Sequence, residues 1–91
     1  MRGIPIEPGR VVRSTAGRDA GRRLIVLSVE GEFVTAADGD LRKAESPKKK
    51  KMRHIKPTPE YFSMIAATIA EGKMPSNAEI RKYLKTDPLE D

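Results

Sequence analysis

The sequence predicts a small β barrel of four or five short strands followed by a helical hairpin, and three observations lead to this prediction. Short β-favouring runs at residues 11–12, 24–29 and 33–36 are separated by turns that contain glycine and aspartate. In the last third of the chain the apolar residues change to the spacing of an amphipathic helix. The length of 91 residues allows one small domain with an appendage. We expect the barrel to span residues 6–56 and the helical hairpin residues 57–91.

The strands are expected to follow one another through tight turns. Gly31 can adopt a positive φ without steric cost, so the second and third runs should form a hairpin. The Asp-Gly pair at residues 38–39 is typical of a further turn, after which residues 41–44 would return as a fourth, partly exposed strand. Residues 52–55 would close the barrel as a fifth strand. The run 24–29 is almost wholly apolar, so we expect both of its faces to be covered.

The first helix is predicted from its ends and its apolar stripe. Thr58 is expected as the N-cap, with Pro59 at the first helical position, where its missing N–H costs nothing. Gly72 is a natural C-cap. Between them, apolar residues recur at the spacing of one helix face: Phe62, Ile65, Ala66 and Ile69.

The second helix is predicted from a capping box. Ser76 and Glu79 have the spacing in which each side chain can bond the other's backbone N–H. One face then carries Ile80, Tyr83 and Leu84, before the Asp-Pro pair at residues 87–88 ends the helix. Two helices this short are marginal alone in water, so we expect them to dock on the barrel or on a partner.

Positive charge is concentrated in the first part of the chain. Residues 1–56 carry 14 basic and 7 acidic residues, a net charge of +7, whereas residues 57–91 carry 4 basic and 6 acidic residues, a net charge of −2. A basic domain of this kind attracts polyanions, and nucleic acid is the first candidate. The alternative, in which the cations only keep a small domain soluble, stays open from charge alone.

Composition excludes several classes of protein. The chain has no cysteine and one histidine, His54, so it lacks a disulfide framework and the ligands of a zinc site. No serine lies in a context typical of a catalytic nucleophile. We therefore expect no enzymatic activity, no cofactor, no metal and no small-molecule substrate. His54 is expected to be an exposed strand residue.

Membrane association is not expected either. No apolar run approaches the roughly 20 residues that a membrane span needs. Residues 1–8 lack the apolar core of an export signal, so we expect a cytoplasmic protein.

A loop that contains two glycines and three arginines lies between the first two strand runs. Gly17 and Gly21 permit a tight turn whose backbone N–H groups could converge on an anion. Guanidinium groups suit phosphate bidentately, and the loop carries Arg18, Arg22 and Arg23. The alternative is an ordinary β-turn in which Asp19 bonds backbone N–H groups.

Four consecutive lysines form the second basic segment. Side chains alternate between faces along a strand, so we expect these lysines to lie in a loop that enters the last strand and to contact successive phosphates. They are Lys48, Lys49, Lys50 and Lys51. The alternative is a solvated charge run that discourages edge pairing.

These segments together resemble the KOW family. The resemblance covers about residues 9–55 and is carried by GRVVRSTAGRDAGR at residues 9–22, the strand 24–29, and SPKKKK at residues 46–51. The segment looks like the branch represented by the archaeal and eukaryotic large-subunit ribosomal protein fourteen-e and by short bacterial KOW-domain RNA-binding proteins.

The resemblance implies an SH3-like barrel that binds ribosomal RNA. The loop 17–22 matches the glycine-containing turn of the family, and residues 47–51 match its basic segment. The candidate RNA contacts are then Arg13, Arg18, Arg22, Arg23, Lys48, Lys49, Lys50, Lys51 and Arg53, and the residues expected to shape the turn are Gly17, Asp19 and Gly21.

The aromatic content of the chain indicates which part of an RNA the protein would contact, its bases or its backbone. Phe33 is the one aromatic residue before residue 57, so the barrel lacks a platform for stacking successive bases. We therefore expect contacts to the backbone and shape of folded RNA.

Two functions follow as hypotheses. The first is a ribosome-associated RNA-binding protein that contacts structured ribosomal RNA, with ribosomal proteins as further partners. The second is a protein-interaction adaptor on a ribosome or transcription complex, in which Ile80, Tyr83 and Leu84 face a partner.

Overall fold

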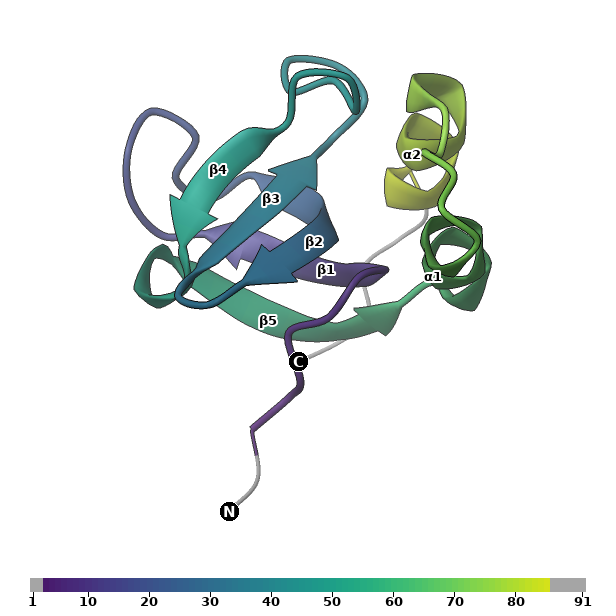
Figure 1. The fold of residues 1–91 in the computed structure, drawn as a ribbon. Helices are drawn as coiled ribbons and strands as arrows, with labels where there is room; N and C mark the ends of the chain where they lie inside the picture. The colour runs from purple at the N-terminus through teal and green to yellow at the C-terminus, as the bar shows by residue number, and fades with distance from the viewer. Residues whose placement is uncertain (1–2, 86–91) are drawn as a thin grey trace.

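The computed structural model describes residues 3–85 and shows a five-stranded antiparallel sheet with two helices on one side (Figure 1). The elements are, in chain order, β1 (Arg10–Ser14), β2 (Arg23–Glu30), β3 (Phe33–Ala37), β4 (Lys48–Lys51), the 3-10 helix η1 (Met52–His54), β5 (Ile55–Tyr61), α1 (Ser63–Ala70) and α2 (Asn77–Leu84). No helix in this part of the chain is long and apolar enough to cross a membrane.

The strands are arranged in the order β4-β3-β2-β1-β5. The predicted hairpin between β2 and β3 is confirmed: Glu30 pairs with Phe33, and Gly31 in the two-residue connection has a φ of +59°. β1 pairs with β2 on one side and with β5 on the other. The sheet therefore has five short strands, the number expected, although the last two lie at other positions in the chain than predicted.

The sheet is strongly curled. In a flat sheet, β4 would lie three strand spacings, about 14 Å, from β1. The Lys50 side chain on β4 nevertheless reaches Ser14 on β1, with 2.8 Å between Nζ and Oγ. The edge strands β4 and β5 do not pair with each other within residues 3–85, so the closed barrel expected from the sequence is not formed.

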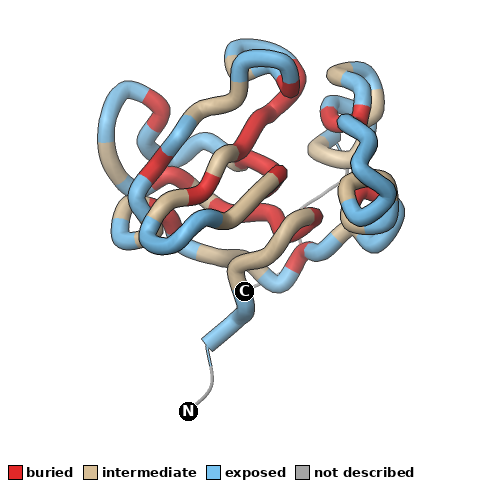
Figure 2. Tube along the Cα trace, viewed as in Figure 1, coloured by how far each residue is buried: buried red, intermediate tan, exposed pale blue. Residues whose placement is uncertain are grey.

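β2 separates two apolar clusters, because its side chains alternate between the faces of the sheet. Leu24 and Val26 point into the curl, where they join Val12, Val34, Ala36 and Ile55. Ile25 and Leu27 point to the other face and pack with Val11, Ala37, Ala44, Ile65 and Ile80. Residues 24–27 are thus buried on both faces, as predicted, whereas residues 28–29 are half-buried; Figure 2 shows this buried trace in the middle of the sheet.

The two helices cover the second cluster. Ile65 of α1 and Ile80 of α2 are fully buried there, and the rings of Phe62 and Tyr83 lie 4.7 Å apart. The expected docking of the helices on the sheet is confirmed.

The predicted helix caps are confirmed at two positions. The Ser76 hydroxyl accepts a hydrogen bond from the Glu79 N–H at 3.1 Å, which caps α2. Gly72 has a φ of +81°, and the N–H groups of Gly72 and Lys73 donate to carbonyls of the last turn of α1. This pattern is the Schellman motif. The predicted end of the second helix at residues 87–88 lies outside the described residues.

The predicted start of the first helix is wrong. Thr58 lies in β5, where its hydroxyl donates to the Val11 carbonyl at 2.8 Å, and the neighbouring Pro57 pairs with Val12 of β1. This pairing with β1 keeps the segment extended, so α1 begins five residues after Thr58, at Ser63. The boundary expected between residues 56 and 57 therefore falls inside β5.

The last two predicted strands are also displaced. Residues 41–44 form a loop, because the Asp38 carboxylate accepts hydrogen bonds from the N–H groups of Asp40 and Arg42 at 2.9 and 2.8 Å. The lysine run, which was expected in a loop, itself forms β4 and pairs with β3. Met52–His54 forms η1, so only Ile55 of the predicted fifth strand lies in β5.

Candidate nucleic-acid interface

A hollow of about 540 Å³ lies between the loop after β1 and the edge strand β4. We call it the basic hollow, because its lining includes Arg18, Arg42, Lys48, Lys49, Lys50, Lys51 and His54. Asp19 is the one acidic residue in that lining. The two basic segments that the sequence analysis treated separately thus border one surface.

The loop that borders the basic hollow is a tight turn that uses both predicted glycines. Gly17 and Gly21 have φ values of +84° and +87°, which other residues rarely adopt. The Gly21 N–H donates to the Ser14 carbonyl at 2.7 Å, and the Ala20 N–H donates to the Gly17 carbonyl at 3.2 Å. The loop therefore has a defined shape held by its own backbone.

Lys50 anchors this loop from below. Its ammonium donates to Ser14 Oγ at 2.8 Å, to the Ala16 carbonyl at 2.7 Å and to Asp19 Oδ1 at 3.0 Å. The Lys50 and Asp19 side chains are each only 6% exposed. Lys50 lies beneath the surface because the side chains of β4 alternate, so one lysine in two points into the curl. Its ammonium is occupied by the loop.

The Asp19 carboxylate is held in its charged form. Burial raises the pKa of Asp19, but the hydrogen bonds from Lys50 and Ser14 and the charge of Lys50 outweigh that effect, and the net pKa lies below 3.8. The carboxylate thus bonds the side chains of Ser14 and Lys50, which neither interpretation of the loop foresaw.

The other cations of the basic hollow are available to a ligand. Within residues 3–85, no hydrogen bond or ion pair occupies the side chains of Arg18, Arg42, Lys48 and Lys51. The Lys49 ammonium lies over the Phe33 ring, 4.8 Å from its centroid. Arg53 is exposed and lies outside the basic hollow, beside Lys51.

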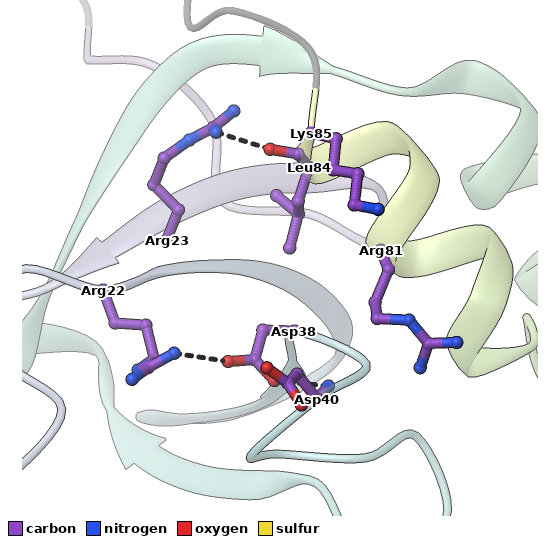
Figure 3. A pocket seen from close by; sticks show the side chains of 7 residues that line it. All are labelled: Arg22, Arg23, Asp38, Asp40, Arg81, Leu84 and Lys85. Carbon is purple, nitrogen blue, oxygen red and sulfur yellow. Dashed lines mark hydrogen bonds and ion pairs between the residues drawn. The ribbon is translucent and has the colours of Figure 1, made fainter.

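The remaining predicted contacts bond to the protein itself. Figure 3 shows a second hollow, of about 290 Å³, where Arg22 forms an ion pair with Asp38 at 3.1 Å and Arg23 donates to the Leu84 carbonyl at 2.9 Å. Arg23 also pairs with the buried Glu60 carboxylate. Arg23 thus joins β2, β5 and the end of α2.

Arg22 and Arg13 do not line the basic hollow. The Arg22 side chain is 40% exposed and lines a third hollow, of about 310 Å³, with Arg18 and Arg42. The Arg13 guanidinium donates to the Gly21 carbonyl at 3.0 Å, so it supports the turn from β1.

Besides Ala16, three residues that line the basic hollow were not among the predicted site residues: Arg42, His54 and Phe33. Arg42 was assigned to a strand that does not form. The expectation that His54 is an exposed strand residue is wrong: it lies in η1 and is half-buried, and its carbonyl accepts a hydrogen bond from the Thr15 N–H at 2.9 Å. Phe33 stands out in the sequence as the one aromatic residue before residue 57, but no local pattern places it beside the lysines of β4.

No protein-family model and no curated protein matches this chain. The resemblance to the KOW family therefore stays an interpretation of the sequence. In the described part of the chain, no group of three His, Asp or Glu side chains could hold a metal ion.

Proposed function

We propose that this protein binds RNA through the basic hollow by contacting backbone phosphates. One observation carries the proposal: Arg18 and Arg42, from two loops, and Lys48, Lys49 and Lys51, from an edge strand, line one hollow. Cations that lack partners in the protein repel one another unless an anion neutralises them. A chain of phosphates supplies several anions at once.

The rigidity of the turn supports the same function. A phosphate contact needs the guanidinium of Arg18 at a fixed place relative to the lysines of β4. The three hydrogen bonds of Lys50 tie the turn to that strand. The backbone that carries Arg18 is therefore held beside β4 before RNA arrives, which lowers the entropic cost of binding.

We further propose that the curled sheet, which is open between β4 and β5, is a variant of the SH3-like barrel of the KOW kind, and that the RNA is structured ribosomal RNA. The pairing of β1 with both β2 and β5 supports the first part. The second part rests on the sequence resemblance. The adaptor alternative has lost one of its contacts, because Ile80 is fully buried against the sheet and cannot face a partner.

The test is the affinity for a folded ribosomal RNA fragment, measured by fluorescence anisotropy at 0.15 M salt. Changing Lys48, Lys49 and Lys51 to glutamine should weaken binding by more than about tenfold, because up to three phosphate contacts are lost. The matched control changes three exposed lysines of the helical part, Lys73, Lys82 and Lys85, to glutamine. It removes the same charge and should weaken binding by less than about threefold. Equal losses in both variants would mean that RNA responds only to net charge and has no site in the basic hollow.

A further inference from the structure

Phe33 stands among the lysines of the basic hollow. It lines that hollow, is half-buried, and pairs directly with Lys51 across the β3–β4 ladder. Lys49 reaches over its ring from the diagonal position. One aromatic ring is thus bracketed by two cations on the strand that carries most of the proposed phosphate contacts.

The cover over the Phe33 ring is removable. Lys49 is exposed and has no hydrogen bond or ion pair within the described residues, so only the contact with the ring holds its ammonium. An exposed contact of this kind changes an equilibrium by only about two- to fivefold. Stacking of a nucleic-acid base on an aromatic side chain is worth about 5- to 150-fold in affinity. A base can therefore replace the ammonium on the ring.

We infer that the RNA bound in the basic hollow carries an unpaired nucleotide whose base stacks on Phe33. This inference rests on the proposed function and narrows its substrate class from folded RNA to folded RNA with a bulged or looped-out base. Phe33 is the one Phe, Tyr or Trp side chain in the lining of the hollow, so we assign one stacked base to it, while the rest of the RNA is held through phosphates.

The charges around the ring orient that nucleotide. When Lys49 leaves the ring, its ammonium and that of Lys51 can bind the phosphates on either side of the stacked base. On the other side of Phe33, its partner in β2 is Glu30, an exposed carboxylate that repels phosphate. The backbone of the RNA is thus directed toward β4, where the remaining cations lie.

The test compares two RNA hairpins that differ in one position. One is fully paired in its stem, and the other carries a single bulged 2-aminopurine. Anisotropy gives both affinities, and 2-aminopurine fluorescence reports stacking. We expect the native protein to bind the bulged hairpin at least about fivefold more tightly and to quench its fluorescence.

Three variants isolate the ring. Phe33→Leu keeps an apolar side chain but has no aromatic face, so it should bind both hairpins equally and leave the fluorescence unquenched. Phe33→Trp should retain the preference, and Lys49→Met should retain it while binding both hairpins more weakly. Thermal unfolding checks that each variant is folded.

The outcomes distinguish base stacking on Phe33 from the proposed binding of RNA through phosphates. Salt-sensitive binding of both hairpins with equal affinity by the native protein would overturn the stacking of a base and leave the phosphate contacts standing. A preference that survives in Phe33→Leu would also overturn the inference. Failure to bind either hairpin would overturn both proposals.

Discussion

The Lys50 ammonium lies 3.0 Å from the Asp19 carboxylate, and both side chains are buried beneath the turn that borders the basic hollow. A buried ion pair adds little stability over an apolar pair of the same size, but removal of one partner leaves an uncompensated charge. Lys50 therefore differs from its three neighbours in the lysine run.

Lys50→Met should lower the free energy of unfolding by about 3 kcal/mol or more, because the Asp19 charge then lacks its partner. Lys51→Met, at an exposed position of the same strand, should change it by no more than about 0.5 kcal/mol. Urea denaturation measures both values. A double variant, Lys50→Met with Asp19→Leu, should recover much of the loss. Equal effects of the two single variants would show that Lys50 does not anchor the turn.

The same pair predicts a pH dependence. The pKa of Asp19 lies below 3.8 in the folded protein, so its contribution to stability is complete above about pH 4 and is lost as the pH falls through the lower folded value. Asp19→Asn lacks this contribution at every pH. The difference in unfolding free energy between the native protein and this variant should be constant from pH 7 to about pH 4 and should shrink below it. Urea denaturation at a series of pH values tests this, and a constant difference down to pH 2 would contradict it.

The salt dependence of RNA binding should distinguish the lysines by position. If four or five cations of the basic hollow reach phosphates, the slope of log K against log[salt] should be about −4 on a duplex. Lys51→Gln should lower the magnitude of this slope by about 0.9. Lys50→Met should leave the slope nearly unchanged, although it weakens binding by loosening the turn. A fall of similar size in both variants would place Lys50 on phosphate and contradict its buried role.

Local sequence patterns predict correctly those turns and caps that are formed by residues close together in the chain. The turn at Gly31 and the cap at Ser76 are such elements: Glu30 and Phe33, which pair across the turn, are three positions apart, and so are Ser76 and Glu79, which bond in the cap. Thr58 is different. Thr-Pro at residues 58–59 fits a helix start as well as an edge strand, and the bond from the Thr58 hydroxyl to Val11, 47 residues away, decides between them.

The candidate site was predicted in its two basic segments but not in its assembly. The sequence indicates that alternate lysines of a strand face opposite sides, but it does not show that β4 curls far enough for Lys50 to reach Ser14. Nor does it place Arg42 beside Arg18, because the Asp38 turn that brings it there replaces an expected strand. These relationships depend on packing between residues far apart in the chain, which local sequence patterns do not predict.

A last prediction concerns the close approach of the Asp38 turn to α2. Gly39 has a φ of +77°, and a Cβ there would lie 2.5 Å from the Asn77 carbonyl oxygen, far inside van der Waals contact. Gly31 has a φ of +59° but has no atom within 4 Å of such a Cβ, so it is the matched control. Gly31→Ala should cost about 1 kcal/mol for the backbone conformation alone. Gly39→Ala should cost about 1–3 kcal/mol more, because the turn and the helix must also separate.

Separation would stretch the 2.6 Å hydrogen bond from Arg81 to the Gly39 carbonyl and move Arg42, which the same turn carries into the basic hollow. RNA affinity should therefore fall in Gly39→Ala and stay constant in Gly31→Ala. Urea denaturation and anisotropy together test this, and equal stabilities of the two variants would show that α2 does not hold the turn.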